Sequence, residues 1–357
     1  MGWGLYIVRI GKSARLVAMA AMAALLGVSS AQAETCGLKR FASFDISSNP
    51  DGMVTIPVTF NGTAETVLVD TGGVYSTVSP SVVAALRLKP QLIRSGFELY
   101  MADGTLLNHY ATIDRLGIGG AGASDVHLII QPQHSQTGIE DFQGTLAPDL
   151  LPNFDLDFDF AHHTLNFFSQ QHCEGKVVYW ANSYAVVPFS LDAGSDHIEV
   201  PVTLDGKDFT ALIDTGSAHT LLSAKAARDN FGLTPDSPGM MPVPGETADA
   251  LVRYAYRFKT LTLNGITVNN PMIGLLRDAM EQGFWKRHDE MVDRDPIYGL
   301  QFRPNRVTVG MNVLRKLHLY IAYKEKKLYV TAADAGIPAP APAATASPAA
   351  PAGPAAP

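Results

Sequence analysis

The chain of 357 residues contains one sequence pattern written twice, and overlooking such a repeat would lead to the wrong fold. Residues 57–79 return without a gap as residues 201–223, a shift of 201 − 57 = 144 positions. Each copy places an Asp-Thr-Gly triplet directly after an apolar run, first at residues 70–72 and again at residues 214–216. The chain therefore has two related halves with the same acidic triplet in the same context.

A second pair of matching blocks lies further along each half. Residues 145–165 match residues 308–328 at a shift of 308 − 145 = 163 positions. Two blocks repeated in the same order predict two homologous lobes. The difference of 163 − 144 = 19 residues predicts extra loop in the second lobe, and we place it within Arg277–Arg306, where charged and aromatic residues mix without a clear period.

Turn and strand signals predict that both lobes are all-β. The pairs Asn61-Gly62 and Asp205-Gly206 separate β-branched runs and are typical of two-residue hairpins. Residues 154–160 alternate apolar residues with aspartates, a period of two that predicts a strand with one buried and one solvated face. Short helices are expected at Pro80–Arg87 and Ala224–Asp229, directly after each triplet segment.

These signals divide the chain into six segments. We expect a signal peptide at residues 1–33, an N-terminal extension at 34–52, a first lobe at 53–172, a linker at 173–192, a second lobe at 193–331 and a disordered Ala/Pro tail at 332–357. The tail has no apolar periodicity with which to build a core.

The predicted signal peptide has the expected parts. Arg9, Lys12 and Arg15 precede an uncharged stretch at residues 16–30, and a small-x-small site ends at Ala33. The stretch is shorter than the ~20 residues that a membrane-spanning helix needs, so an uncleaved anchor is the weaker alternative. We therefore expect an exported protein, periplasmic or secreted, with no stable membrane span after cleavage.

Export affects the interpretation of the two cysteines, Cys36 and Cys173. In an oxidising compartment we expect a disulfide between them, which would close a loop of 173 − 36 = 137 residues. The alternative is two unpaired, buried thiols. A net charge of −7 and the lack of any Lys/Arg-rich run argue against a nucleic-acid partner.

The two triplets have a chemical use if the lobes are related by a pseudo-two-fold axis, because such symmetry would bring Asp70 opposite Asp214. Two carboxyl groups about 3 Å apart cannot both ionise, so they would share one proton. The ionised member could then take a proton from water while the other donates to a carbonyl oxygen. The backbone N–H groups near Gly72 and Gly216 would support the carboxylates.

The residues around the triplets resemble a known family, the pepsin-like and retropepsin-like aspartic peptidases, and most closely bacterial exported members with both lobes in one chain. The resemblance covers about residues 53–330 and rests on residues 69–73 and 213–217, with the later elements Leu146-Ala147 and Val309-Gly310. It implies six-stranded, barrel-like lobes and peptide-bond hydrolysis by an activated water. It also implies no metal or other cofactor, and a peptide or protein substrate held under a hairpin flap.

The resemblance assigns roles to individual residues. Asp70 and Asp214 carry over as the catalytic pair, so one chain is sufficient to build the site and no dimer is required. Five residues are expected to support the pair: Thr71, Gly72, Thr215, Gly216 and Ser217. The hydroxyls of Thr71 and Thr215 are expected to form hydrogen bonds between the lobes. The first-lobe flap is placed at Leu99–Leu106, and its candidates for substrate contact are Tyr100, Asp103 and Gly104. A second flap is placed at Met241–Ala248.

Two departures from the family pattern keep a second function open. Gly73 stands where the family usually has Ser, as Ser217 does in the second lobe, and Ala147 replaces the usual Gly. The alternative is a non-catalytic, peptide-binding protein on the same bilobal fold. Glycoside hydrolysis also uses two carboxylates, but the duplicated Asp-Thr-Gly context is not its signature.

The histidines do not predict a metal site. The sequence has ten, and none shows the His-x-x-x-His or equivalent spacing of metal ligands. We expect them to be ordinary surface or turn residues. His219, five positions after Asp214, is the one histidine for which a place along the substrate site is considered, with simple packing as the alternative.

Overall fold

The computed structural model describes residues 37–46, 52–93, 99–100, 106–131, 142–243, 252–276 and 306–335, all of which belong to one compact unit. The predicted signal peptide lies outside these ranges, as do Cys36, Asp103, Gly104 and the tail from residue 336 onward. Within the described ranges, no helix has the length and hydropathy needed to cross a membrane.

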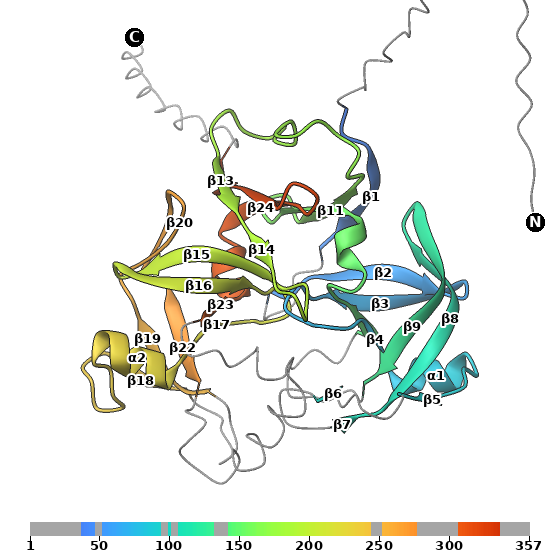
Figure 1. The fold of residues 1–357 in the computed structure, drawn as a ribbon, viewed down its shortest axis with the longest axis horizontal. Helices are drawn as coiled ribbons and strands as arrows, with labels where there is room; N and C mark the ends of the chain where they lie inside the picture. Colours follow the sequence, from blue (N-terminus) through green and yellow to red (C-terminus); the bar gives the residue numbers. More distant parts are fainter. Residues whose placement is uncertain are drawn as a thin grey trace, which may run out of the picture. The chain divides into compact units, whose positions relative to one another are not determined.

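The first lobe is a closed barrel of six strands, blue to green in Figure 1. In sheet order its strands are β2 (Thr55–Phe60), β3 (Thr63–Val69), β10 (Gly144–Leu146), β4 (Thr77–Val78), β9 (Ala121–Ile130) and β8 (His109–Ile118). The barrel closes because β8 also pairs with β2, with Thr59 opposite Gly117. At its rim lie β5 (Gln91–Leu92), α1 (Pro80–Ala85) and a separate hairpin of β6 (Leu99–Tyr100) and β7 (Leu106–Leu107).

The second lobe repeats this order. In sheet order its strands are β21 (Ile266–Asn269), β20 (Thr260–Leu263), β15 (Ile198–Leu204), β16 (Lys207–Ile213), β23 (Arg306–Val309), β17 (Thr220–Ser223), β22 (Met272–Leu276), β19 (Val252–Arg257) and β18 (Met240–Pro242), and β14 (Ser190–Leu191) pairs with β15. In both lobes the strand before the triplet runs parallel to the later strand, β3 to β10 and β16 to β23. The helix α2 (Ala224–Phe231) follows β17 as α1 follows β4.

One long hairpin differs between the lobes. The first lobe has the unbroken strands β8 and β9, whereas the second has β19 with β20 and β21 with β22 in their places. The break lies at Pro271, which has no N–H for a ladder, and at the neighbouring Asn270, whose φ of 51° is left-handed. The sequence therefore sets this difference locally.

The predicted hairpins and helices are confirmed. Asn61 and Gly62 have φ of 52° and 88°, and Asp205 and Gly206 have φ of 44° and 78°, so both central residues of each two-residue turn are left-handed. The helices begin after Ser79 and Ser223, whose hydroxyls cap the first turn. The predicted extra loop of the second lobe lies outside the described residues, between β22 and β23.

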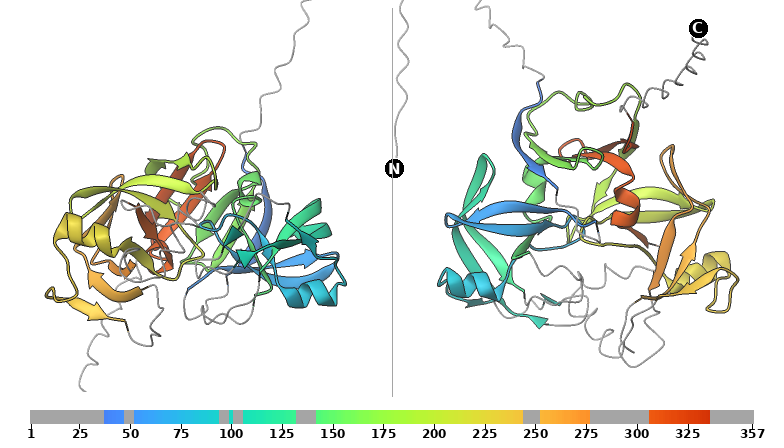
Figure 2. Two further views of the ribbon diagram at one scale, coloured as in Figure 1. Left: turned by 60° about the horizontal axis from the view of Figure 1, so that its bottom comes forward. Right: turned by 180° about the vertical axis from the view of Figure 1, so that it is seen from behind.

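A third sheet joins the two halves, and Figure 2 shows it from two further sides. Its six strands, in order, are β1 (Arg40–Asp45), β12 (Thr164–Phe168), β11 (Asp155–Asp159), β24 (Leu317–Ala322), β25 (Lys327–Ala332) and β13 (Ala185–Pro188). Short helices precede its two central strands, η2 (Leu151–Asn153) before β11 and α5 (Met311–Leu314) before β24. β1 lies in the segment predicted as the N-terminal extension, and β13 in the predicted linker.

The register of β11 against β24 expresses the pseudo-two-fold symmetry. Leu156 pairs with Ile321 and Phe158 with Leu319. At the repeat shift of 163, Leu156 corresponds to Leu319 and Phe158 to Ile321. Leu156 therefore pairs with the residue that corresponds to Phe158, and Phe158 pairs with the residue that corresponds to Leu156. Exchange of the two strands leaves this pairing unchanged, which is the condition for a two-fold axis between them. The fold is thus all-β, with two homologous lobes.

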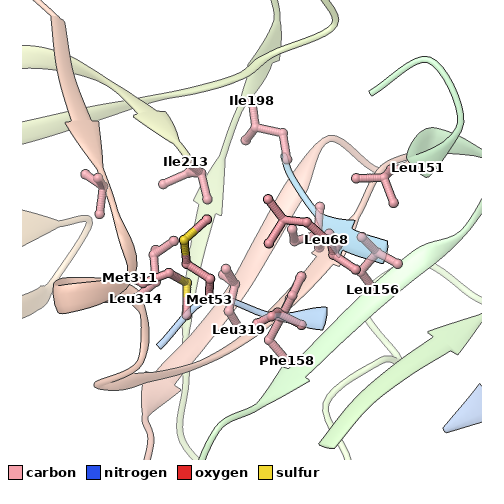
Figure 3. Packing of buried hydrophobic residues seen from close by; sticks show 14 of the residues in the cluster. Met53, Leu68, Leu151, Leu156, Phe158, Ile198, Ile213, Met311, Leu314 and Leu319 are labelled. Atoms are coloured by element: carbon pink, nitrogen blue, oxygen red, sulfur yellow. The ribbon is translucent and has the colours of Figure 1, made fainter. Parts of the chain in front are cut away.

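The core is continuous across the halves. Figure 3 shows Met53 of the first lobe beside Met311 of the second, and Leu68, Ile213 and Leu319 belong to the same buried cluster. The lobes therefore share one buried cluster and one sheet.

Two expectations about polar residues were wrong. The aspartate face of β11 is not solvated, because Asp155 and Asp157 are fully buried and hydrogen-bonded to His172 and His318. His197 is also completely buried, so these three histidines are not surface residues. The outer face of the shared sheet is covered by the segment after β12, which periodicity alone could not reveal.

Candidate active site

The two triplets begin where a barrel strand ends. β3 stops at Val69, and the Asp70 N–H donates to the Leu146 carbonyl at 2.9 Å. In the second lobe, the Asp214 N–H donates to the Val309 carbonyl at 3.1 Å. In both places the parallel partner strand holds the backbone of the aspartate, so the duplicated topology sets both acids in the same way.

The threonines tie the two triplets together. Thr71 Oγ1 donates to the Ile213 carbonyl at 2.7 Å and accepts the Thr215 N–H at 3.1 Å. Thr215 Oγ1 donates in turn to the Val69 carbonyl at 2.6 Å and accepts the Thr71 N–H at 3.1 Å. Both threonines are completely buried. This reciprocal set of four hydrogen bonds brings the ends of β3 and β16 into direct contact.

The glycines let each carboxyl group lie against the opposite loop. A Cβ placed on Gly72 would be 2.2 Å from Cγ of Asp214, and one on Gly216 would be 2.2 Å from Oδ1 of Asp70. Real Cβ atoms do not approach so closely, so no side chain fits at either glycine. Each carboxyl group therefore occupies the space that a side chain on the other lobe would fill.

The two carboxyl groups face the same interface and influence each other's pKa, and their environments differ. Oδ1 of Asp70 accepts the Gly72 N–H at 3.0 Å and the Gly73 N–H at 2.7 Å, whereas Oδ1 of Asp214 accepts the Gly216 N–H at 2.9 Å. Both aspartates are only partly exposed.

These environments raise the pKa of both aspartates. Burial raises the pKa of Asp70, and its two backbone hydrogen bonds partly offset that rise. Burial followed by the charge of Asp70 raises the pKa of Asp214 well above its usual value. The arrangement favours one shared proton, with the better-supported carboxylate on Asp70.

Further hydrogen bonds connect the first triplet loop to the strand end at Leu146-Ala147. The Ala147 N–H donates to Oγ of Ser76 at 2.9 Å, and the Ser76 hydroxyl donates to Oδ1 of Asp149 at 2.6 Å. Ser76 N–H donates to the same oxygen at 2.9 Å. A chain of donors thus links the loop after Asp70 to the Leu146-Ala147 element.

The second lobe contains the same chain with different residues. The Gly310 N–H donates to Thr220 Oγ1 at 3.1 Å, and the Thr220 hydroxyl donates to Oδ1 of Asn312 at 2.7 Å. The positions correspond at the repeat shifts, since 76 + 144 = 220 and 149 + 163 = 312. No motif in the sequence marks these residues, but the two repeat shifts identify them as paired polar positions.

The loops differ most at Gly73 and Ser217. The Ser217 hydroxyl donates to the His219 carbonyl at 2.8 Å, inside its own loop. A Cβ on Gly73 would come within 2.8 Å of Oδ2 of Asp70 and 3.4 Å of Cβ of Ala147. Gly73 therefore leaves room for both the Asp70 carboxylate and the Ala147 methyl group.

The remaining predicted site residues lie apart from this network or outside the description. Leu99 pairs with Leu107 and Tyr100 with Leu106, so the flap candidate is a hairpin in its strands, while its turn with Asp103 and Gly104 is outside the described residues. The His219 side chain is exposed. Among the residues that the structure describes, no group of His, Cys, Asp or Glu could hold a metal ion.

Cys173 forms a disulfide bond. The sequence contains one other cysteine, the predicted partner Cys36, which lies outside the described ranges.

Comparison with known families places a match on each lobe. A family model described as "Aspartyl protease" matches residues 200–292, which include the second triplet. A model described as "gag-polyprotein putative aspartyl protease" matches residues 56–139, which include the first. A search of curated proteins found no match.

Proposed function

Because the chain belongs to the retropepsin-like aspartic peptidases, with two lobes in one chain, we propose that it is an endopeptidase in which Asp70 and Asp214 activate a water molecule. The observation that carries the proposal is the packing of each carboxyl group against the glycine of the opposite triplet, which brings the two acids to the same interface. Such a pair holds an acid and a base within reach of one substrate carbonyl.

The proposed reaction follows from the donors around each acid. The carboxylate on Asp70, supported by two N–H groups, takes a proton from the attacking water. The protonated carboxyl group on Asp214 donates to the carbonyl oxygen of the scissile peptide bond. A tetrahedral intermediate results without a covalent bond to the enzyme. As it collapses, Asp70 gives the proton taken from water to the leaving nitrogen and Asp214 takes back a proton from the hydroxyl, so the amine leaves and the pair returns to its starting state.

The same residues lead us to propose that a single chain suffices for activity, since both acids come from one sequence. The N-terminal signal-peptide pattern and the disulfide of Cys173 support our proposal that the protein works outside the cytoplasm, in the periplasm or as a secreted protein. Sequencing the N-terminus of protein purified from the exporting cell tests this, because export with cleavage predicts a start near Glu34.

The test of the reaction compares the mature protein with Asp70→Asn and Asp214→Asn on a denatured protein substrate between pH 3 and pH 7. We expect turnover by the unaltered protein, inhibition by a statine-type transition-state mimic, and a loss of at least about 10³-fold in kcat/KM in either variant. Folding of each variant is checked by its thermal transition. Tight peptide binding with no turnover by the unaltered protein would instead support the non-catalytic peptide-binding function.

The shared proton predicts a bell-shaped dependence of kcat/KM on pH. Activity falls at low pH when both carboxyl groups are protonated and at high pH when both are ionised. Because burial raises both pKa values, the alkaline limb should lie above the ordinary pKa of an aspartate. A flat profile would contradict the dyad.

A further inference from the structure

His197 connects the second lobe to the triplet loop of the first. It directly precedes β15 and is completely buried. Its Nε2 lies 2.9 Å from the carbonyl oxygen of Gly73. A carbonyl oxygen only accepts hydrogen bonds, so Nε2 carries the hydrogen and donates it. The N–H of the same Gly73 donates to Asp70. His197 therefore binds the backbone of the residue whose N–H supports the Asp70 carboxylate.

The second lobe satisfies the equivalent carbonyl in another way. The Ser217 carbonyl accepts the backbone N–H of Met311 at 2.8 Å. The residue that corresponds to Met311 is Pro148, since 311 − 163 = 148, and proline has no N–H. The backbone donor available to Ser217 is therefore missing for Gly73.

The residue that corresponds to His197 differs as well. It is Met53, since 197 − 144 = 53, and a methionine side chain has no hydrogen to donate. Met53 packs beside Met311 in the core (Figure 3). The two departures from symmetry are thus complementary: Pro148 removes a donor from the first loop, and His197 supplies one from the opposite lobe.

We propose that His197 is a positioning residue for the Asp70 loop, and that its Nε2–H replaces, across the lobe interface, the backbone donor that Pro148 cannot provide. Gly73 lacks a side chain and so has more backbone freedom than Ser217. An anchor on its carbonyl restricts that freedom and keeps its N–H directed at Asp70.

The charges around the ring are consistent with a neutral donor. Burial, followed by the charge of Arg306, lowers the pKa of His197 to about 4, and Asp192 and the Gly73 carbonyl act in the opposite direction. The ring is therefore neutral above about pH 4, with its hydrogen on Nε2. Nδ1 is buried with no hydrogen-bond partner among the described residues, which also disfavours the imidazolium.

The test uses a matched set of variants and two readouts. His197→Met introduces the residue of the equivalent first-lobe position and removes the donor, whereas His197→Gln keeps an N–H donor on a side chain of similar length. Pro148→Ala, added to His197→Met, restores a backbone N–H at the position of Met311. The readouts are kcat and KM on a peptide, and hydrogen exchange of the Gly73 amide compared with that of Gly216 in the other loop.

We expect His197→Met to lower kcat by about 10–100-fold with KM little changed, since a displacement of about 1 Å costs that much in rate. Exchange at Gly73 should accelerate at least about tenfold while exchange at Gly216 stays the same. His197→Gln and the double variant should recover most of both losses. If His197→Met does not fold, recovery of folding in the double variant, which differs from it only by the restored N–H, would support the inference, and a double variant that also fails to fold would contradict it.

Three results would overturn the inference: unchanged exchange at Gly73 in His197→Met, equal acceleration in both loops, or no recovery in either rescue variant. The inference rests on the proposed function only through kcat. If the unaltered protein cleaves nothing but exchange at Gly73 responds as expected, the proposed function fails and the positioning role stands. If it cleaves normally and exchange does not respond, the positioning role alone fails.

Discussion

The proposed site depends on the absence of a side chain at Gly72 and Gly216. In each case the hydrogen of the glycine lies where a Cβ would overlap the carboxyl group of the opposite aspartate. Two acids can therefore share a proton across the interface only because both facing residues have no side chain. The asymmetry between Gly73 and Ser217 shows that the rest of each loop can vary.

A methyl group on Gly72 should disrupt the pair. The Cβ of Gly72→Ala would lie 2.2 Å from Cγ of Asp214, so the carboxyl group or the loop must move. We expect kcat/KM to fall by at least about 10²-fold and stability by about 1–3 kcal/mol. Peptide hydrolysis and urea denaturation measure the two effects. Gly37→Ala, with nothing within 4 Å of its Cβ, is the matched control and should change neither quantity. Unaltered activity in Gly72→Ala would show that the carboxyl groups do not need this geometry.

Asp214 should weaken the fold at neutral pH. Its pKa is raised in the folded protein by burial and by the charge of Asp70, so the unfolded chain ionises at a lower pH than the folded one. No stability is lost below the unfolded pKa, and stability is lost progressively as pH rises through the folded pKa.

Replacing this acid by an amide should remove that loss. Asp214→Asn should raise Tm at pH 7 and leave it nearly unchanged at pH 3, with each kcal/mol recovered appearing as about 2–4 °C. Thermal unfolding across this pH range measures the effect, and the exposed Asp208→Asn serves as control. A lower Tm of Asp214→Asn at pH 7 would mean that the ionised acid stabilises the fold.

Among the secondary-structure elements, β11 departs most from what its pattern predicts. Its aspartates alternate with apolar residues as on a half-exposed strand, but the segment after β12 covers the polar face. Asp157 accepts from His318 at 2.8 Å, from Asn166 at 3.0 Å and from the Tyr179 hydroxyl. Trp180 stacks on His318 with ring centroids 4.0 Å apart. A period of two identifies two faces of a strand, but it does not tell which face another segment will cover.

Truncating Asp157 should therefore be costly. Asp157→Ala leaves His318 and Asn166 buried without their acceptor and also removes the acceptor of the exposed Tyr179, and we expect a loss of about 3–5 kcal/mol in the free energy of unfolding. Asp157→Asn keeps an acceptor for His318 and should lose less. Asp208→Ala, at an exposed position, is the control and should change stability by no more than about 0.5 kcal/mol. Guanidinium denaturation decides the matter, and equal effects of Asp157→Ala and Asp208→Ala would contradict a structural role for the cluster.

For the molecule as a whole, two devices join the lobes: the shared sheet and the reciprocal threonine bonds. The sheet contributes extended backbone pairing and a continuous apolar core. The threonines act at the interface itself, where both hydroxyls both donate and accept. The sheet should therefore dominate stability, while the threonines align the two acids.

Removing one hydroxyl should loosen this alignment. Thr71→Val leaves the Ile213 carbonyl and the Thr215 N–H without their partner, and we expect a loss of about 2–5 kcal/mol in stability and a disproportionate fall in kcat. Thr71→Ser retains the hydroxyl and should recover most of the activity. Denaturation and kcat are measured side by side. A valine variant with full activity would assign the alignment of the acids to the sheet instead.

The repeat, the two-residue hairpins and the helix starts could all be predicted from the sequence because each depends on neighbouring residues. Asn61-Gly62 tolerates left-handed backbone, and Ser79 caps the helix that follows it, whatever lies elsewhere in the chain. Asp70 and Asp214 could be selected as a pair because duplication followed by symmetric packing gives one pattern two facing copies.

Other features depended on contacts between segments far apart in the chain. The burial of Asp155 and Asp157 follows from the segment that covers β11, and the role of His197 follows from a proline 49 residues earlier that lacks an N–H (197 − 148 = 49). Hydrogen bonds and desolvation act over a few ångströms in space and take no account of separation along the chain. Local pattern therefore predicts turns, caps and repeats, whereas the partners of buried polar groups emerge only when the chain is packed.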